Sequence, residues 1–451
     1  MKGDVRDTIA AISTPPGRGG IGIVRVSGPA AAKIGAQICG RLPEPRVAVN
    51  ARFRDASNEI IDQGLAIYFP APASFTGENV LELHGHGGAV VMDMLLGCVL
   101  EAGARLARPG EFSQRAFLND KMDLAQAEAV ADLIDSASRT AALSAQRTLQ
   151  GEFSRRINAV VETLVALRAY VEGAIDFPEE EIDFLAEGEI GARIQRILSE
   201  LEAVRDAAVQ GCLLREGMTV VIAGATNVGK SSLLNRLSGR ESAIVTHVHG
   251  TTRDVLREHI HLDGLPLNVV DTAGLRATQD EVEREGIARA RSEISTADVL
   301  LAMVDDREHD EASRLGLWQE FGNPPQFMLV RNKIDLTGRE PGVFNAPFGT
   351  EILISAKTGA GLEGLVDALK GAVGYRPAGE GSFTARRRHL EAIRAALEHG
   401  RAAKAQFEGR PAGELIAEDL RQMQNALGEI TGTFTADDLL ERIFSSFCIG
   451  K

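Results

Sequence analysis

The sequence predicts a multidomain chain with an α+β region at the N-terminus, an all-α region, and an α/β region inserted into the all-α one. Three observations indicate this. The chain has 451 residues, which is too long for one ordinary hydrophobic core. Apolar residues recur at helical spacing from about Asp120 to Leu214 and again from Leu390 onward. Between these stretches lie short apolar runs separated by helical or loop segments, which is typical of a mostly parallel sheet with crossover helices.

The first 119 residues mix strand and helix patterns. The stretch "PPGRGGIGIVRVSG" joins a glycine-rich turn to an alternating strand, and "IIDQGLAIYF" and "VLELHGHGG" have the pattern of further strands. The stretch "AVVMDMLLGCVLEAG" has the pattern of a helix. We therefore predict an α+β domain here. His84 and His86 would lie on one side of a strand, but no third ligand accompanies them, so we predict no metal site.

The helical region falls into two parts of the sequence. The first has apolar runs at helical spacing around "FPEEE", and the second begins near Leu390 and ends in a helix after Thr435. The termini of a compact domain tend to lie close together, so both parts can share one core around an inserted middle domain. Two separate helical pieces are the alternative. The predicted boundaries are 1–119 for the N-terminal domain, 120–214 and 377–451 for the two helical parts, and 215–376 for the inserted domain.

Charge and composition exclude several classes of protein. A formal net charge of −14 would repel a polyanion on average, so nucleic-acid binding must use a local basic patch or a partner. The one dense basic run, "RRRH" from Arg386 to His389, is more typical of a solvated helix start. Four widely spaced cysteines without a C-x-x-C pair argue against a disulfide framework or a structural zinc site. No apolar run is long enough for a membrane span or a secretory signal, which predicts a cytoplasmic protein without membrane attachment.

A phosphate-binding loop is predicted at the start of the inserted domain. The stretch "GATNVGKSS" fits the pattern G-x-x-x-x-G-K-[ST] from Gly224 to Ser231, directly after the apolar run "TVVIA" and before "LLNRLSG". In such a loop, backbone N–H groups and the N-terminus of the following helix hold phosphate. Lys230 can reach the outer phosphates, and the hydroxyl of Ser231 can bind magnesium.

Companion motifs follow in the order found in GTPases. "GTTRD" offers Thr252 as a second magnesium ligand, and "DTAG" places Asp271 at a strand end near the magnesium. In "NKID", Asp335 can accept two hydrogen bonds from the guanine N–H edge that adenine lacks, and "SAK" supports the base through a backbone N–H. The inserted domain is therefore predicted to be a Ras-like P-loop GTPase. The predicted GTP contacts are Asn227, Val228, Gly229, Lys230, Ser231, Ser232, Thr246, His247, Val248, His249, Gly250, Thr251, Thr252, Asp271, Thr272, Ala273, Gly274, Asn332, Lys333, Asp335, Ser355, Ala356 and Lys357.

The hydrolytic residues depart from those of Ras-type GTPases. Leu275 follows "DTAG" where those proteins carry a water-positioning Gln, so the water-orienting group must lie elsewhere. Glu283 in "RATQDEVERE" is one candidate. The alternative interpretation, that this stretch is a solvated helix face, is equally consistent with the sequence. Asn227, together with the hydroxyls of Thr246 and Thr251, could build a potassium site beside the phosphates in place of an arginine finger.

With these motifs the chain resembles the MnmE (TrmE) family of bacterial tRNA-modification GTPases. The likeness spans essentially the whole chain and includes "DTIAAISTPPGRGGIGIVRVSG", "SFTGENVLELHGHGG", "RPGEFSQRAFLNDKMDLAQAEAVADLID", "AIDFPEEEIDF" and the terminal "FSSFCIGK". Two stretches depart from the family pattern. Thr226 stands where the family has Pro, and the switch loop reads "THVHGTT" where an Asp and a small residue are usual.

The resemblance implies a homodimer that works with the FAD-containing partner MnmG in a heterotetrameric complex. Together they would add an aminomethyl or carboxymethylaminomethyl group to the wobble uridine of certain tRNAs. The one-carbon unit would come from 5-formyl- or methylene-tetrahydrofolate held by the N-terminal domain. By position, the resemblance assigns potassium to Asn227, Thr246, Thr251 and the carbonyl of Val248, magnesium to Ser231 and Thr252, water orientation to Glu283, and folate to Arg25, Glu82, Lys121 and Lys451. From the residues alone, Arg25 and Lys121 could equally be surface charges.

We consider three roles for Cys448 in the terminal "FCIGK": a prenylation site, a packing residue and a functional residue. Prenylation is disfavoured because Gly450 and Lys451 are poor third and fourth residues of a CaaX box. Packing is credible because Cys448 continues the apolar face of Phe444 and Phe447. The resemblance places this tail beside the folate, and we predict a functional tail in which Cys448, like Lys230 and Glu283 in the GTPase domain, is a candidate catalytic residue.

A different class of function is also considered. An Era-like GTPase acting as a regulatory factor in ribosome assembly would share the nucleotide motifs. Such a protein is expected to carry an RNA-binding module such as KH after the GTPase domain, where this sequence predicts helices.

Overall fold

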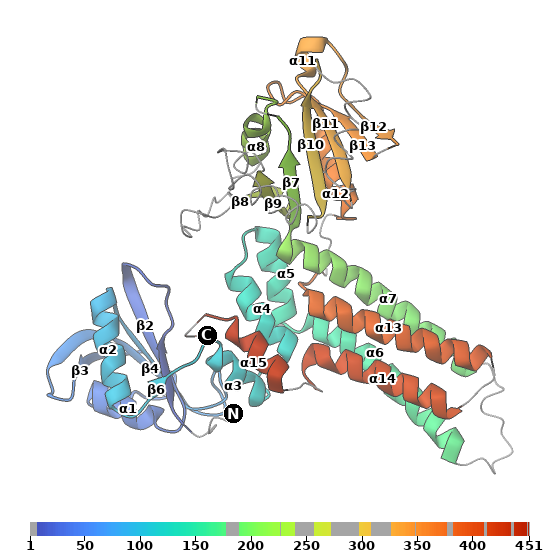
Figure 1. The fold of residues 1–451 in the computed structure, drawn as a ribbon. Coiled ribbons are helices and arrows are strands. Elements are labelled where there is room, and N and C mark those ends of the chain that lie inside the picture. The colour runs from blue at the N-terminus through green and yellow to red at the C-terminus, as the bar shows by residue number, and fades with distance from the viewer. Residues whose placement is uncertain are drawn as a thin grey trace, which may run out of the picture. The chain divides into compact units, whose positions relative to one another are not determined.

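The computed structural model describes residues 7–176, 189–225, 227–239, 257–271, 297–307, 326–347, 349–376, 382–409, 413–433, 437–448 and 450 (Figure 1). The chain forms two compact units. The first comprises Met1–Ala131, Leu149–Gln195 and Ala395–Lys451, and the second comprises Asp132–Thr148 and Arg196–Arg394. Each unit is therefore built from segments that lie far apart in the sequence.

The first unit contains a six-stranded sheet with strand order β3-β4-β5-β2-β1-β6. All neighbours pair antiparallel except β1 and β6. The predicted strand "IIDQGLAIYF" is β4 from its first residue to its last. The strands are β1 (Ile9–Ile12), β2 (Gly19–Ser27), β3 (Val49–Arg54), β4 (Ile60–Phe69), β5 (Val80–Gly87) and β6 (Arg105–Leu106).

This sheet has a hydrophobic core on each face, because alternate side chains of a strand point in opposite directions. Helices α1 (Ala31–Cys39) and α2 (Ala89–Glu101) cover one face, where Ala10 of β1 joins the core. Ile9 and Ala11 of β1 instead pack with Phe112 of α3 (Glu111–Leu118). The residues of β2 and β5 that share the second face, Arg25 and Glu82 among them, lie on the side of α3.

Helices from both sides of the GTPase motifs share this unit. Helix α6 (Glu152–Asp176) packs along α14 (Gly413–Thr431), and Arg168 Nη1 donates a hydrogen bond to Gln424 Oε1 at 2.6 Å. Within the unit, α7 (Glu189–Glu216) meets α13 (Arg387–Glu408), where a Cβ on Gly191 would lie 2.6 Å from the ring of Phe407. Helices α4 (Leu124–Ile134) and α15 (Asp437–Ser445) share a further apolar cluster. The prediction of an inserted domain between two helical parts is confirmed.

The second unit contains a seven-stranded sheet with strand order β12-β13-β11-β10-β7-β9-β8. The pairs between β13 and β9 are parallel, and only β12 and β8 at the edges pair antiparallel. This is the mostly parallel sheet that the sequence predicts. The strands are β7 (Met218–Ala223), β8 (Arg257–Leu262), β9 (Leu265–Asp271), β10 (Val299–Asp305), β11 (Phe327–Asn332), β12 (Gly342–Ala346) and β13 (Gly349–Leu353).

The central strands of this sheet are buried on both faces, as expected for parallel strands. Val220 and Ile222 of β7 pack with helices α8 (Lys230–Ser238) and α12 (Leu362–Ala372), while Val221 and Ala223 enter a separate core on the opposite face. Helix α5 (Arg139–Leu149) and the short α11 (Ile334–Thr337) also belong to the described part of this unit. In the described residues, no helix combines the length and apolar character needed to cross a membrane.

A buried ion-pair network stabilises the first unit. Arg115 of α3 contacts Asp7 at 2.6 Å, Glu78 at 3.0 Å and Glu111 at 3.2 Å. Arg105 adds ion pairs to Asp7 and Glu111. The side chain of Glu111 is only 3% exposed. Burial alone would disfavour its ionised form, but hydrogen bonds from Arg105 and from neighbouring groups hold the pKa of Glu111 at about 2.

We expect Glu111→Gln to lower the free energy of unfolding near pH 7 by roughly 1 to 3 kcal/mol, because the buried guanidinium group of Arg115 and the partly exposed one of Arg105 lose a charged partner. Since the folded-state pKa of Glu111 lies below its usual value of 4.5, the unfolded state binds more protons. This contribution is therefore complete above about pH 4.5 and is lost as the pH falls toward 2. Urea-unfolding midpoints across this range measure it. Glu44→Gln removes an exposed charge and is the control; equal acid sensitivity of wild type and Glu111→Gln would contradict the prediction.

Candidate functional site

The predicted nucleotide motifs lie at one edge of the second sheet. In a parallel sheet the carboxyl ends of the strands meet at the same edge, where ligands of α/β proteins bind. The phosphate-binding loop follows β7, Asp271 ends β9, Asn332 ends β11, and Ser355 lies two residues after β13. Order along the sheet thus brings together motifs that are more than 100 residues apart in sequence.

Two glycines shape the loop between β7 and α8. Gly224 has φ +151°, and a Cβ there would lie 2.3 Å from the carbonyl oxygen of Met303. Gly229 has φ +102°, and a Cβ there would lie 2.3 Å from Asn332 Nδ2. Both positions therefore require glycine, for backbone conformation and for space. Asn227 also has a positive φ, of 68°, and Asn is among the residues that tolerate this region.

Lys230 is held inside this loop. Its Nζ donates hydrogen bonds to the carbonyl oxygens of Gly224 and Ala225, each at 2.9 Å, and the residue is 7% exposed. Ser231 and Ser232 lie in the first turn of α8 and are exposed. The ammonium group is thus fixed by the loop that it would share with a phosphate, and the Ser231 hydroxyl is accessible to a ligand.

Asn332 joins the phosphate loop to the loop after β13. Its Nδ2 donates to the carbonyl oxygen of Val228 at 2.7 Å, and its Oδ1 accepts from the backbone N–H of Ala356 at 2.9 Å. Asn332 is 2% exposed. Its amide therefore uses one donor and its acceptor on the protein, which makes it a residue that positions the site.

Asp335 is exposed at the start of α11. Its Oδ1 accepts a hydrogen bond from Ser355 Oγ at 2.7 Å, and Ser355 Oγ in turn accepts from the backbone N–H of Thr358 at 3.2 Å. The carbonyl of Lys357 accepts a hydrogen bond from Arg236 at 2.6 Å. A carboxylate oriented in this way can receive a pair of parallel N–H donors, as a guanine base offers.

Sequence reasoning missed two acidic residues that support the "NKID" segment. Asp305 accepts a hydrogen bond from Lys333 Nζ at 2.7 Å, and Asp306 contacts Arg331 at 2.6 Å and accepts from Thr337 Oγ1 at 2.5 Å. Hydrogen bonds from Arg307 and then Lys333 hold the pKa of Asp305 well below its usual range, although burial opposes this. The available signal was the pair of acids that ends "ADVLLAMVDD".

Several predicted site residues lie outside what the structure describes. The backbone of Asp271 is described as the end of β9, but its side chain is not. Leu275 is also outside the described residues, as are the predicted site residues Thr246, His247, Val248, His249, Gly250, Thr251, Thr252, Thr272, Ala273, Gly274, Glu283 and Lys451.

The predicted folate residues Arg25 and Glu82 are paired in the first unit. They are opposite each other on β2 and β5, and Arg25 Nε donates to Glu82 Oε1 at 2.9 Å. The guanidinium carbon of Arg25 lies 5.4 Å from the ring centre of Phe75 and 5.8 Å from that of Phe112. The second oxygen of Glu82 lies 3.2 Å from His84 Nε2. A cation, a carboxylate and aromatic rings thus meet on one face of the sheet.

The other described folate residue, Lys121, follows α3 and contacts the segment between β4 and β5 that carries Phe75. Its Nζ donates to the carbonyl oxygen of Pro72 at 3.1 Å. The C-terminal tail returns to the same unit. The carbonyl of Gly450 accepts a hydrogen bond from Ser13 Oγ at 3.1 Å, just after β1, and that of Cys448 accepts from the backbone N–H of Gly110 at 3.4 Å. Cys448 itself is an exposed free cysteine. The interpretation of Cys448 as a packing residue therefore does not hold for its side chain.

Comparison with known proteins finds likeness along the whole chain. Residues 8–121 match the family model of the GTP-binding protein TrmE N-terminus, and residues 124–448 match that of the MnmE helical domain. The tRNA modification GTPase MnmE of Pseudomonas putida is 58% identical over 453 residues, which cover 99% of each chain. That of Pseudomonas paraeruginosa is 59% identical with the same coverage. Among solved structures, a variant of the Era GTPase of Aquifex aeolicus is 27% identical, in a match that covers 40% of this chain and 66% of that chain at a TM-score of 0.27.

Proposed function

Since the chain belongs to the MnmE family of tRNA modification GTPases, we propose that it couples GTP hydrolysis to modification of the wobble uridine of certain tRNAs. In this proposal it works with the FAD-dependent partner MnmG and adds an aminomethyl or carboxymethylaminomethyl group. The observation that carries the proposal is the identity of 58% to 59% over 99% of the chain, which includes both the nucleotide site and the N-terminal unit. The geometry of both units supports it.

The nucleotide site fits GTP. Lys230 lies in the loop that would surround the phosphates, and Asn332 connects this loop to the base-binding side. Asp335, oriented by Ser355, would accept the two N–H groups of guanine. We assign magnesium to Ser231 and Thr252, potassium to Asn227, Thr246, Val248 and Thr251, and water orientation to Glu283.

The N-terminal unit fits a reduced folate that carries a one-carbon unit. Arg25 offers a cation between two aromatic rings, and Glu82 offers acceptors for the N–H groups of a pterin. Lys121 can reach an anionic glutamate tail from the neighbouring segment. When bound, the folate would supply a one-carbon group at the formyl or methylene level. The tail that contains Cys448 is anchored on the same unit through Gly450, which supports a function for Cys448 and Lys451 near this ligand.

The remaining parts of the proposal concern assembly and location. We propose a homodimer, joined with MnmG in a heterotetramer, that acts on tRNA in the cytoplasm. The Era-like alternative expects a KH module after the GTPase domain. In the described residues from 382 to 448, α13, α14 and α15 occupy this position, so this alternative has no structural support.

Deletion of the gene tests the proposal. We expect tRNA from the deletion strain to lose the modified wobble nucleoside, with the unmodified uridine in its place, and a plasmid copy to restore it. Mass spectrometry of digested tRNA measures both nucleosides. An unchanged nucleoside profile, together with a ribosome-assembly defect, would reject this function in favour of the Era-like one.

A further inference from the structure

A tRNA-modifying chain with a net charge of −14 needs a local basic surface if it is to touch RNA. The dense basic run from Arg386 to His389 does not provide one. Arg386 is paired with Asp132 at 2.7 Å and Arg387 with Glu216 at 2.7 Å, and the side chain of Arg386 is only 15% exposed. The expectation that this run is a solvated helix start is therefore wrong for Arg386. Both guanidinium groups are thus paired with carboxylates of the second unit.

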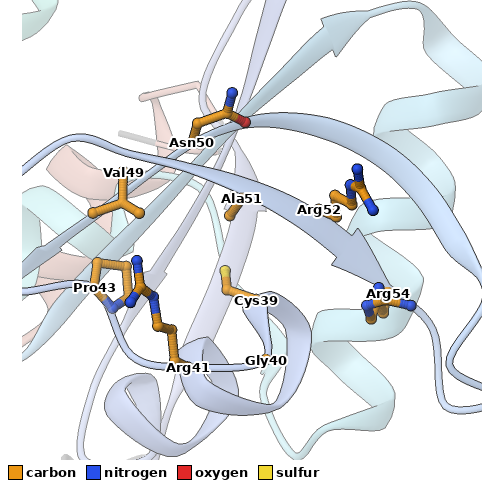
Figure 2. A pocket seen from close by; sticks show the side chains of 9 residues that line it. All are labelled: Cys39, Gly40, Arg41, Pro43, Val49, Asn50, Ala51, Arg52 and Arg54. Atoms are coloured by element: carbon orange, nitrogen blue, oxygen red, sulfur yellow. The ribbon is translucent and has the colours of Figure 1, made fainter.

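A different basic surface lies on the first unit, in a groove of about 380 Å³ beside β3 (Figure 2). Three arginines line it, Arg41, Arg52 and Arg54, with the amide of Asn50. No acidic residue of the described chain is among its lining residues. These arginines are up to 13 positions apart and form no run in the sequence. The fold alone brings them together.

The groove lies where β3 meets the turn after α1. Ala51 and Phe53 face the core that α1 covers, and Arg52 and Arg54, which alternate with them, start from the opposite face of β3 and line the groove with Ala51. β3 is the first strand in the sheet order, so one of its sides is an edge. Arg41 comes from the turn that ends α1. The thiol of Cys39 lies between these elements (Figure 2).

The charge of the groove comes from the arginines alone. Burial raises the pKa of the Cys39 thiol to about 11, so this group stays neutral at physiological pH. Arg54 donates to the carbonyl oxygen of Asn58, which is a neutral group. Within the described part of the chain, neither Arg41 nor Arg52 forms an ion pair or a side-chain hydrogen bond. By contrast, Arg105 and Arg115 of the same unit are each neutralised by carboxylates.

We propose that this groove binds the phosphate backbone of the tRNA. This inference rests on the proposed function, which makes tRNA the substrate. Guanidinium groups bind phosphate oxygens bidentately and remain charged at every relevant pH. Alternate side chains of a strand stand about 6.8 Å apart, and Figure 2 shows the guanidinium groups at separate positions along the groove. Separate positions suit successive phosphates better than they suit one small anion.

A second explanation for these arginines is weaker. Charged side chains on an edge strand discourage pairing with the edge of another sheet. This role would account for Arg52 and Arg54, but it requires neither a groove nor Arg41 from a different segment. Binding of the tRNA phosphates accounts for all three arginines. Because it involves only the backbone of the RNA, it would position the tRNA without reading its sequence.

The test is tRNA binding by the full-length triple variant Arg41→Gln/Arg52→Gln/Arg54→Gln, measured by fluorescence anisotropy with an end-labelled unmodified tRNA. We expect the affinity near 50 mM salt to fall about tenfold or more. We also expect the slope of log affinity against log salt to become shallower by about 2, since three phosphate contacts are lost. Equal melting temperatures of the variant and the wild type show that the variant is folded.

A matched control carries the same change in net charge. Arg155→Gln/Arg196→Gln/Arg421→Gln removes three exposed arginines that form helical ion pairs with Glu152, Glu200 and Glu418. We expect this control to bind tRNA within about twofold of the wild type. The proposal is overturned if the groove variant binds as the control does, if the wild type binds no tRNA, or if micromolar inorganic phosphate displaces tRNA from the wild type. The nucleoside profile of the deletion strain tests the proposed function separately, because it does not depend on the groove.

Discussion

Lys230→Met is expected to lower the rate of GTP hydrolysis by roughly 10²- to 10³-fold, the range found when one preorganised donor is removed from a developing charge. Methionine has nearly the same length and keeps the packing of a residue that is 7% exposed. It removes the ammonium group that Gly224 and Ala225 hold in the loop. The phosphates would then lack their one fixed cation from the described part of this loop.

Phosphate release under saturating GTP, with nucleotide binding measured in parallel, separates loss of hydrolysis from loss of affinity. Lys33→Met is the control, because Lys33 is an exposed lysine of α1 far from the nucleotide motifs in sequence. Its rate should match the wild type. Melting temperatures detect any loss of folding, since the variant leaves two loop carbonyls without this donor. Hydrolysis by Lys230→Met within threefold of the wild type would remove Lys230 from the catalytic residues.

Local patterns in the sequence were sufficient to predict most of the described strands and helices. The run "IIDQGLAIYF" is a strand over its full length, and "MTVVIA" is β7, because strands of these kinds have a characteristic alternation or a continuous apolar run. The motif "GATNVGKSS" determines a loop and a helix N-terminus, since its glycines must adopt backbone conformations that other residues avoid. Such features leave a local signal in the sequence, so they can be predicted from a single sequence.

Features built by long-range pairing could not be predicted in the same way. The network around Arg115 joins residues from 7 to 115, and Asn332 contacts Val228, 104 positions away. The basic groove depends on the edge position of β3 and on the approach of the turn after α1 to that strand, and neither the strand order nor this approach has a local signal. The acids Asp305 and Asp306 are recognisable as supports only when their partners around "NKID" are known. Strand order and register decide these contacts.

Asp335→Asn is the variant that tests the choice of base. We expect it to weaken GTP binding roughly 10²- to 10⁴-fold, because each of two charge-assisted hydrogen bonds contributes about 1.5 to 3 kcal/mol. The guanine N–H groups would then face an amide that has one acceptor and two donors. The exposed position of Asp335 and its single described partner, Ser355, make a folding defect a minor effect.

The same substitution should create a preference for xanthosine triphosphate. Xanthine carries a carbonyl where guanine carries its amino group, and the new amide of Asn can donate to that oxygen while accepting from the ring N–H. Dissociation constants for GTP and xanthosine triphosphate, measured by calorimetry for the wild type, Asp335→Asn and the exposed α12 control Asp367→Asn, give the comparison. The control should keep the wild-type order of affinities. If Asp335→Asn still bound GTP more tightly than xanthosine triphosphate, the base would have to be read by other groups, and the orientation of Asp335 by Ser355 would have only a structural role.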